Sequence, residues 1–254
     1  MSPGMNILLV DAGNTRVKWA LADITAAPGQ WLAHGAVPHA ELPALAGAWG
    51  ALDAACALVS NVAGADVRAQ LGAVLAHLPV TWFASMPALA GITNGYRNPF
   101  QLGCDRFASA IGARALNPGH PLVVATCGTA TTIDAIDAHG VFIGGMILPG
   151  LALMAGALAH NTAQLPQVAP GSALPPTFAD NTLDAIVSGC VAAQAGAIER
   201  AVAAHGGAPC IVSGGAAAYI VPALTITHTV RDNLVLAGLH AAAGALAQQG
   251  ELSC

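Results

Sequence analysis

The most informative segment of this sequence is residues 7–21, which read Ile7-Leu8-Leu9-Val10-Asp11-Ala12-Gly13-Asn14-Thr15-Arg16-Val17-Lys18-Trp19-Ala20-Leu21. The apolar run from Ile7 to Val10 predicts a buried strand, and the alternation of apolar and basic residues from Arg16 onward predicts a second one. Gly13 and Asn14 between them are typical of a hairpin turn. The sequence therefore predicts a β-hairpin whose tip carries short polar side chains.

The tip of this hairpin has the chemistry of a phosphate and metal site. Gly13 allows a close approach of the backbone, Asp11 supplies a hard oxygen ligand for Mg²⁺, and Lys18 supplies a point charge for phosphate. Lys18 is the only lysine in the chain, whose other seven basic residues are arginines. A solvated hairpin edge, where a lysine deters strand pairing, explains the same residues, so this segment alone leaves both interpretations open.

Composition narrows the class of protein. The 254 residues suffice for one large or two modest domains, and a net charge of −5 without a basic cluster predicts no nucleic-acid partner. Residues 141–159 are uncharged and long enough to span a bilayer. Pro149 and several glycines nevertheless favour a buried strand, a turn and a short helix in this segment. We therefore expect no membrane partner. Residues 1–5 lack the basic start of a signal peptide, which predicts a cytoplasmic protein.

The spacing of the cysteines and histidines argues against C-x-x-C sites and against a dedicated zinc site. The six cysteines show no C-x-x-C pattern, so we expect small hydrophobic core residues in a reducing cytoplasm. The nine histidines show no H-x-x-x-H pair, so we expect no dedicated zinc site.

Strand and helix patterns alternate along the first half of the chain. Residues 23–50 carry a further strand and end in a helix over 42–49, and residues 54–61 form an apolar strand that ends at Ser60-Asn61. A helical pattern over 65–78 and a strand over 80–84 follow. This order predicts a layered α/β domain.

A polar loop over residues 91–105 precedes an alanine-rich helix over 106–116. Its chemistry-bearing members include Tyr96, Gly103, Asp105 and Arg106. Asp105 stands where a helix N-cap would stand, so a structural cap and a catalytic carboxylate remain alternatives from this segment alone.

A second hairpin repeats the first. Residues 122–134 again give an apolar strand, a glycine turn, a threonine-rich tip and a second strand, and Gly128 follows Gly13 by 115 residues. A repeat of that period predicts two similar α/β halves, each presenting a glycine turn to a central cleft, where the two turns hold a triphosphate from both sides.

The remaining segments complete the second half. Gly144 to Gly150 predicts a tight turn, residues 167–178 a loop, and residues 181–204 a long apolar helix that suits pairing across a dimer. Residues 210–217 predict a strand and a turn at Gly214-Gly215, where an adenine or ribose fits close to the backbone, and residues 233–248 a final helix.

In these residues the chain resembles the type III pantothenate kinases, over nearly its whole length. The resemblance rests on five ordered motifs, which are residues 11–18, residues 96–99 with 103–106, residues 128–134, residues 144–150 with 162–166, and Asn181-Thr182. It implies duplicated ribonuclease-H-like domains of the actin-like ATPase fold, with residues 1–118 and 119–254 as the two halves. It also implies ATP-dependent phosphorylation of pantothenate to 4′-phosphopantothenate, the first step of coenzyme A biosynthesis.

The resemblance assigns roles to individual residues. Asp11 organises Mg²⁺. ATP is bound by Thr129 and by the first turn, whose members are Ala12, Gly13, Asn14, Thr15, Arg16, Val17 and Lys18. Pantothenate is bound by Tyr96, Gly103, Cys104 and Arg106, and Asp105 is the base that takes the hydroxyl proton. The residue that matches Thr182 comes from the neighbouring subunit, which implies a homodimer. Many members carry an acidic residue that helps to bind a monovalent cation where this chain has Thr126, so we predict little or no activation by K⁺ or NH₄⁺.

Two other functions fit the sequence. An ATP-binding regulator would use the same cleft without phosphorylating a substrate, and an actin-like kinase for another hydroxylated small molecule would differ only in residues 96–106. Consumption of ATP with pantothenate or with a panel of sugars separates the three.

Overall fold

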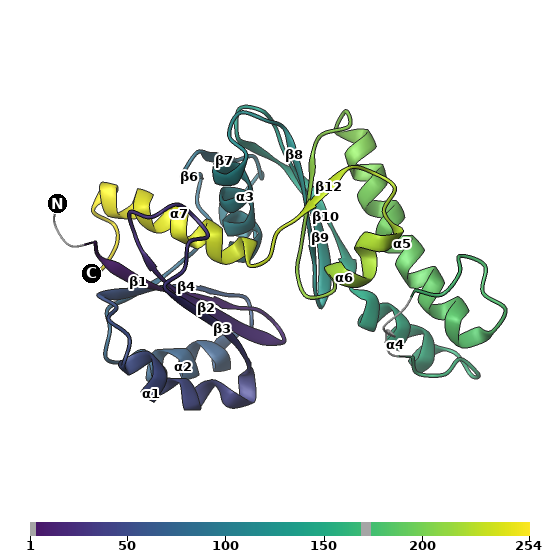
Figure 1. Ribbon diagram of the computed structural model, residues 1–254, viewed down its shortest axis with the longest axis horizontal. Coiled ribbons are helices and arrows are strands. Elements are labelled where there is room, and N and C mark those ends of the chain that lie inside the picture. The colour runs from purple at the N-terminus through teal and green to yellow at the C-terminus, as the bar shows by residue number, and fades with distance from the viewer. Residues whose placement is uncertain (1–3, 169–173) are drawn as a thin grey trace. The chain divides into compact units, whose positions relative to one another are not determined.

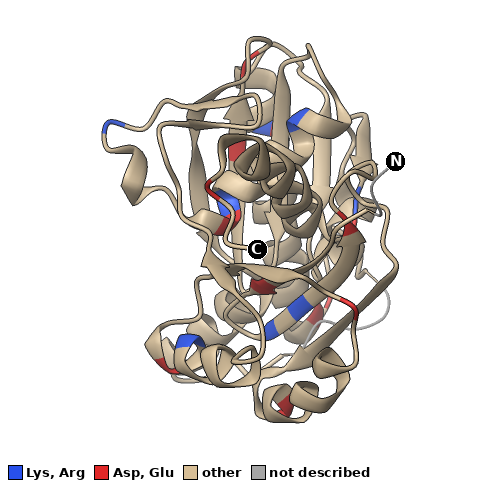
Figure 2. Ribbon diagram, turned by 90° about the vertical axis from the view of Figure 1, so that its left-hand side faces the viewer, with Lys and Arg blue, Asp and Glu red and all other residues tan. Residues whose placement is uncertain are grey.

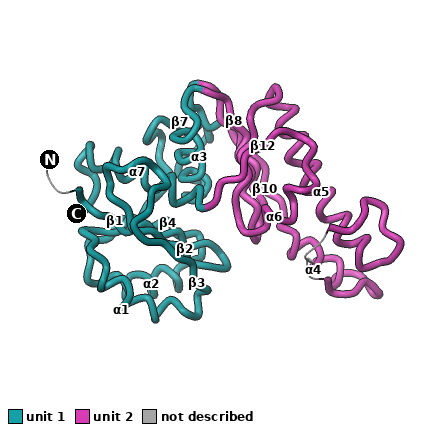
Figure 3. The backbone as a smooth tube through the Cα atoms, viewed as in Figure 1, with its two compact units in different colours: residues 1–119, 139–142, 233–254 teal, residues 120–138, 143–232 magenta. Residues whose placement is uncertain are grey.

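The computed structural model describes residues 4–168 and 174–254, and it divides into two compact units. Unit 1 comprises residues 1–119, 139–142 and 233–254, and unit 2 comprises residues 120–138 and 143–232 (Figure 3). Residues 1–3 and 169–173 lie outside the described residues. The first group belongs to the N-terminal segment expected to lack a signal peptide, and the second to the expected loop over 167–178.

Unit 1 is built on a five-stranded sheet in the order β3-β2-β1-β4-β5. The strands are β1 (Asn6–Ala12), β2 (Arg16–Asp23), β3 (Ala33–Pro38), β4 (Cys56–Asn61) and β5 (Val80–Trp82). β1 pairs antiparallel with β2 and parallel with β4, so the predicted hairpin lies at the centre of the sheet. β6 (Ala88–Leu89) and β7 (Ile92–Asn94) form a small antiparallel hairpin, and β7, which also pairs with Val141 and Phe142, lies in the segment over 91–105 expected to be a loop.

Helices cover both faces of this sheet (Figure 1). One face packs on η1 (His39–Ala44), α1 (Leu45–Gly50) and α2 (Ala65–Val74), around a core that includes Val10 and Trp49. The other face carries α7 (Leu234–Gln249), which packs on α3 (Cys104–Leu116). These two helices approach closely at Gly112 and Gly238, because a Cβ on either would collide with the backbone of the other helix. A short turn of helix, η2 (Pro99–Gln101), precedes α3.

Unit 2 repeats the same plan. Its strands are β8 (Leu122–Cys127), β9 (Ala130–Ile136), β10 (Val141–Pro149), β11 (Cys210–Ser213) and β12 (His228–Val230). They lie in the order β12-β11-β8-β9-β10 in a seven-stranded sheet, which continues from β10 to β7 and β6. β8 pairs antiparallel with β9 and parallel with β11, as β1 pairs with β2 and β4. This matched order confirms the predicted duplication. The helices are α4 (Leu151–Asn161), α5 (Thr182–Ala204) and α6 (Ala217–Ile220), followed by η3 (Val221–Ala223).

The two units are not continuous halves of the chain, whereas the expected division has a single boundary after residue 118. β10 begins in unit 1, where Val141 and Phe142 pair with β7, and continues in unit 2. The final helix, α7, belongs to unit 1, because its apolar residues pack on α3 and on the central strands of the first sheet.

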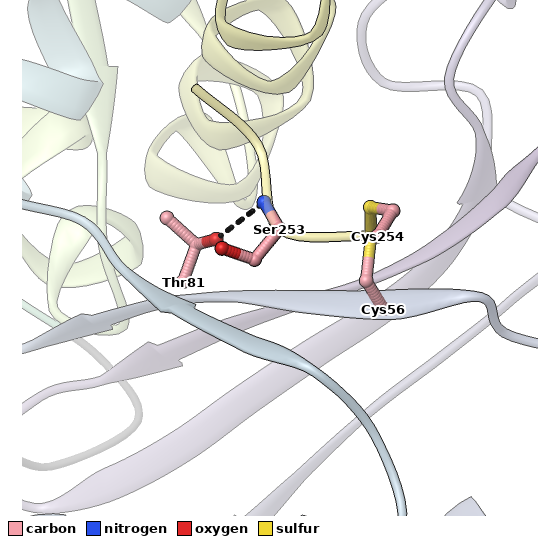
Figure 4. Close-up of a disulfide and its surroundings, with 4 residues drawn as sticks. All are labelled: Cys56, Thr81, Ser253 and Cys254. Carbon is pink, nitrogen blue, oxygen red and sulfur yellow. Dashed lines mark hydrogen bonds between the residues drawn. A yellow bond between two sulfur atoms is a disulfide. The ribbon is translucent and has the colours of Figure 1, made fainter. Parts of the chain in front are cut away.

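Two expectations about the core are wrong. Cys56 and Cys254 form a disulfide bond across 198 residues, close to a hydrogen bond from the Ser253 amide to the Thr81 hydroxyl (Figure 4). The pairing arises because α7 brings the end of the chain to β4, which no local spacing predicts. The expected buried strand over 141–149 exists but is largely exposed, and the side chain of Ile147 is 66% exposed.

The uncharged segment over 141–159 is a strand, a Pro-Gly turn and the eleven-residue helix α4, as predicted. Among the described residues one helix, α5, is long and apolar enough to cross a membrane by length and composition. It packs on α4, β8 and β9 within unit 2, and core helices pass the same test.

Candidate active site

Charged residues are sparse in this chain, at 8% of the total (Figure 2). Two of them, Asp11 and Lys18, lie together at one edge of the unit 1 sheet. Asp11 lies at the end of β1, directly across the ladder from Lys18 of β2 and beside Ser60 of β4. Because β1 and β4 are parallel, their carboxyl ends share this edge. The edge therefore presents an acidic, a basic and a hydroxyl side chain together.

Asp105 reaches the same place from the start of α3. The N-cap residue of that helix is Gly103, so the alternative in which Asp105 is the N-cap is wrong. The Asp105 carboxylate does accept a hydrogen bond of 2.8 Å from the backbone N–H of Arg106. A Cβ added to Gly103 would stand 2.7 Å from the Asp105 carboxylate, so glycine at this position leaves room for the acid.

The two carboxylates influence each other. The pKa of Asp11 is raised to about 7, mainly by burial and also by the charge of Asp105, while the charge of Lys18 opposes both effects. Burial also raises the pKa of Asp105, while the hydrogen bond and the charge of Arg106 lower it. The structure thus brings Asp11, Lys18 and Asp105, three of the residues to which the resemblance assigns roles, into one electrostatic cluster. Paired carboxylates with raised pKa values are typical of catalytic and metal-binding sites.

Cys104 connects the helix that carries Asp105 to β4. Its thiol lies 3.3 Å from the Ser60 hydroxyl and donates to the carbonyl of Asn61 at 3.7 Å. Burial raises the pKa of this thiol, which keeps it protonated near neutral pH and makes it a poor nucleophile. Its observed contacts are those of a residue that holds α3 in place.

Arg106 and Tyr96 form the second part of the cluster. Arg106 is 7% exposed and donates a hydrogen bond of 2.8 Å from Nη1 to the Tyr96 hydroxyl. Phe142 supports both: the guanidinium lies 5.7 Å from its ring centroid, and the Tyr96 ring meets it edge to face at 5.7 Å. Sequence reasoning missed Phe142, since no local pattern shows that the start of β10 lies under the segment over 91–105.

The turn of the first hairpin is held at Gly13. The Gly13 N–H donates to the Arg16 carbonyl at 3.1 Å, and the Gly13 carbonyl accepts a hydrogen bond from Nε2 of His39 at 2.8 Å. A Cβ added to Gly13 would meet only the Arg16 carbonyl oxygen, at 3.6 Å, which is ordinary contact. Internal packing therefore does not require glycine at position 13. Sequence reasoning also missed His39, which is 26 residues from its partner.

The second hairpin, in unit 2, has a closely similar tip. The Gly128 N–H donates to the Ala130 carbonyl at 3.0 Å, and a Cβ there would also meet one carbonyl oxygen at 3.6 Å. Its turn is one residue shorter, because Ala12 pairs with Val17 whereas Cys127 pairs with Thr131. The Thr129 carbonyl accepts from Gly150, which closes the turn before α4 against this tip.

The two glycines expected near adenosine differ in their surroundings. Gly214 has a φ of +97°, and a Cβ there would collide with the carbonyl of Cys127, so the fold itself requires glycine. Gly215 is exposed and has open space around its Cα. Thr182 is exposed at the start of α5, whose N-cap is Asn181, with the Asn181 side chain accepting from the Asp184 N–H at 3.0 Å.

Two sheets that share a five-strand order, each with a glycine hairpin, define a protein of the duplicated actin-like ATPase fold. The fold agrees with two solved structures. One is the ethanolamine utilization protein EutJ from Carboxydothermus hydrogenoformans, with a TM-score of 0.57, 14% identity, and coverage of 96% of this chain and 90% of that one. The other is the activator of the 2-hydroxyisocaproyl-CoA dehydratase from Clostridium difficile, with a TM-score of 0.51, 13% identity, and coverage of 98% and 99%.

Sequence comparison identifies the family. The family model for type III pantothenate kinase matches residues 7–204. A type III pantothenate kinase from Herminiimonas arsenicoxydans is 57% identical over 250 residues, covering 93% of this chain and 97% of that protein. This chain belongs to the type III pantothenate kinase family. It is accordingly a kinase that phosphorylates pantothenate with ATP, the first step of coenzyme A biosynthesis.

Proposed function

We propose that Asp105 is the base that accepts the proton of the primary hydroxyl of pantothenate while the γ-phosphoryl group of ATP is transferred to that oxygen. The observation that carries this assignment is the cluster of Asp11, Lys18 and Asp105, in which burial raises the pKa of both acids. A base is most effective when its pKa lies near the working pH, and burial moves Asp105 in that direction.

Positioning supplies most of the rate in this proposal. Phosphoryl transfer generally passes through a loose transition state, so orientation and neutralisation of the phosphate charge outweigh removal of the proton. The turn at residues 12–18 binds the phosphates through its backbone, with Lys18 as the point charge, and Thr129 of the second hairpin binds them as well. Glycine at position 13, which packing does not require, leaves space for a phosphate oxygen.

Mg²⁺ binds at Asp11 in this proposal. The described residues contain no group of three or more His, Cys, Asp or Glu side chains that could hold a metal alone. Mg²⁺ in kinases usually takes one or two carboxylates together with substrate phosphates and water, so Asp11 next to a phosphate-binding turn fits this ion. The metal would neutralise charge on the transferred phosphoryl group.

Pantothenate binds beside Asp105 on the same unit. Arg106 suits the carboxylate of pantothenate, because a guanidinium forms paired hydrogen bonds to that group. Tyr96, Gly103 and Cys104 complete this side of the site in our proposal. At the nucleotide end, Gly215 accommodates the adenosine, next to the structurally required Gly214.

A monovalent cation has no acidic ligand at residue 126. The Thr126 hydroxyl is buried and has no hydrogen-bond partner among the described residues. A neutral hydroxyl attracts K⁺ or NH₄⁺ much less than a carboxylate does. We therefore propose little or no activation by either ion.

A homodimer completes the pantothenate site, with Thr182 supplied by the neighbouring subunit. Unit 2 also exposes a set of large apolar side chains, and a second copy would cover them. They are Ile143, Met146, Ile147, Leu153, Leu158, Phe178 and Leu183. In this proposal the enzyme acts in the cytoplasm and binds neither nucleic acid nor membrane.

The test of the reaction is ATP turnover by the purified chain with different acceptors. Mg²⁺ and ATP with pantothenate should give ADP and phosphopantothenate in equal amounts, and a panel of sugars should give neither. Turnover with a sugar but not pantothenate would assign the site to another kinase reaction. Tight ATP binding without turnover would favour a regulator.

A further inference from the structure

His39 lies beside the phosphate-binding turn because of the register of the sheet. β3 ends at Pro38, which pairs with Arg16 at the start of β2. The next residue, His39, begins η1 and is half-buried against the turn over residues 13–16. The position of this side chain is therefore fixed by the strand pairing that forms the hairpin.

Both backbone polar groups of Gly13 are held. Its N–H donates to the Arg16 carbonyl at 3.1 Å, and its carbonyl lies 2.8 Å from Nε2 of His39. A carbonyl can only accept, so Nε2 carries the hydrogen and donates it. The Gly13 carbonyl shares its peptide plane with the Asn14 N–H, so the bond to His39 restrains the orientation of the plane between Gly13 and Asn14, while the bond to Arg16 restrains the preceding plane.

We infer that His39 is a positioning residue for the nucleotide, because it holds the Gly13 carbonyl away from the phosphates and directs the Asn14 N–H toward them. In a trans peptide the C=O and N–H groups point in opposite directions, so a bond that anchors one fixes the other. A free turn could rotate this plane and present the carbonyl oxygen, which repels phosphate. The inference rests on the proposed binding of ATP phosphates by residues 12–18.

Three substitutions of His39 separate this role from simple attachment of η1 to the hairpin. His39→Gln places an amide N–H about where Nε2 donates, whereas His39→Asn places it nearer the position of Nδ1, and His39→Ala removes the donor. His34→Ala is the matched control, since His34 is an exposed histidine on β3 that faces the Ala20 position of β2. All four are compared with the unsubstituted enzyme by steady-state kinetics and thermal unfolding.

The expected result is a rise of about three- to tenfold in the KM for ATP for His39→Ala and His39→Asn, the size expected for one hydrogen bond. His39→Gln and His34→Ala should keep the KM of the unsubstituted enzyme, and the KM for pantothenate should stay constant throughout. An attachment role alone would lower the unfolding temperature without moving the KM for ATP, and that result would overturn the inference. If the Ala variant does not fold, the Gln and Asn variants still decide the question.

Lys18→Ala distinguishes failure of this inference from failure of the proposed function. If Lys18→Ala raises the KM for ATP but His39→Ala and His39→Asn do not, the turn binds phosphate and the role of His39 is wrong. If Lys18→Ala also leaves the KM for ATP unchanged, the proposed phosphate-binding turn is wrong, and the inference about His39 falls with it.

Discussion

The Nη1 atom of Arg106 donates a hydrogen bond of 2.8 Å to the hydroxyl oxygen of Tyr96, and both side chains rest on the ring of Phe142. This bond restrains a guanidinium that is almost completely buried. A long side chain held in one rotamer before its ligand arrives loses less entropy on binding. In the proposed site, the pair would hold Arg106 ready to bind the carboxylate of pantothenate.

Removal of the Tyr96 hydroxyl should weaken pantothenate binding selectively. We expect Tyr96→Phe to raise the KM for pantothenate about three- to tenfold, because Arg106 loses one hydrogen bond and its fixed orientation. The KM for ATP and kcat should change little, and steady-state kinetics with each substrate varied in turn measures all three. An equal rise in both KM values would contradict a role confined to pantothenate.

The glycines of the two units should respond differently to alanine. Gly13→Ala should fold with unchanged stability and raise the KM for ATP, because its Cβ fits the protein but occupies the space proposed for phosphate. Gly214→Ala should lower the free energy of unfolding by about 1–3 kcal/mol, because its φ is +97° and a Cβ would collide with Cys127. Urea unfolding and ATP kinetics of both variants test this contrast. A destabilised Gly13→Ala protein with normal kinetics would assign position 13 to packing instead.

The raised pKa of Asp11 predicts how stability depends on pH in the absence of Mg²⁺ and nucleotide. The folded protein holds the Asp11 proton up to a pKa of about 7, whereas the unfolded chain releases it near the ordinary value of 3.8. The contribution of Asp11 to stability is therefore complete below pH 4 and is lost as the pH rises through 7.

Asp11→Asn removes this titration. The unfolding free energy of the variant minus that of the unsubstituted protein should therefore be larger at pH 8 than at pH 5, by an amount on the order of a few kcal/mol. Asp105 is present in both proteins, so the difference in urea unfolding free energy reports mainly on Asp11. A difference that is the same at both pH values would show that the Asp11 carboxylate titrates normally.

A shared site between subunits predicts complementation. Asp105→Asn and Thr182→Ala homodimers should each be weakly active, because every site in them carries a defect. In a mixed dimer, one site combines an intact Asp105 with an intact Thr182 from the other subunit. Activity should therefore rise after the two variants are unfolded together and refolded, and activity that stays at the average of the two would contradict the shared site.

Local patterns predicted much of this fold. Each hairpin shows its turn glycine and its alternating strands within about fifteen residues, and the duplicated sheet follows from finding that pattern twice. The hairpin signals lie in short segments, where spacing alone carries the information. The resemblance to the type III pantothenate kinases predicted Asp11, Lys18 and Asp105 as one site, whereas the local patterns alone left a hairpin-edge role open for Lys18 and a helix cap open for Asp105.

Contacts between distant segments were not predictable in this way. The bond between Cys56 and Cys254 depends on the path of α7, and the support that Phe142 gives to Arg106 depends on a strand that passes from one unit to the other. The exposure of β10 was not predicted, because an apolar strand has the same sequence pattern whether its own unit or another surface covers it. Gly214 illustrates a third limit, since the sequence does not distinguish a glycine that the backbone needs from one that leaves space for a ligand.

The most direct measurement is the kcat of Asp105→Asn with saturating pantothenate and Mg²⁺-ATP, together with the Kd for pantothenate. Asparagine keeps an oxygen for the Arg106 N–H, so the helix start should remain intact. If Asp105 is the base, kcat should fall about 10²- to 10⁴-fold while pantothenate still binds. A kcat close to that of the unsubstituted enzyme would contradict this account and leave Asp105 with a structural role at the start of α3.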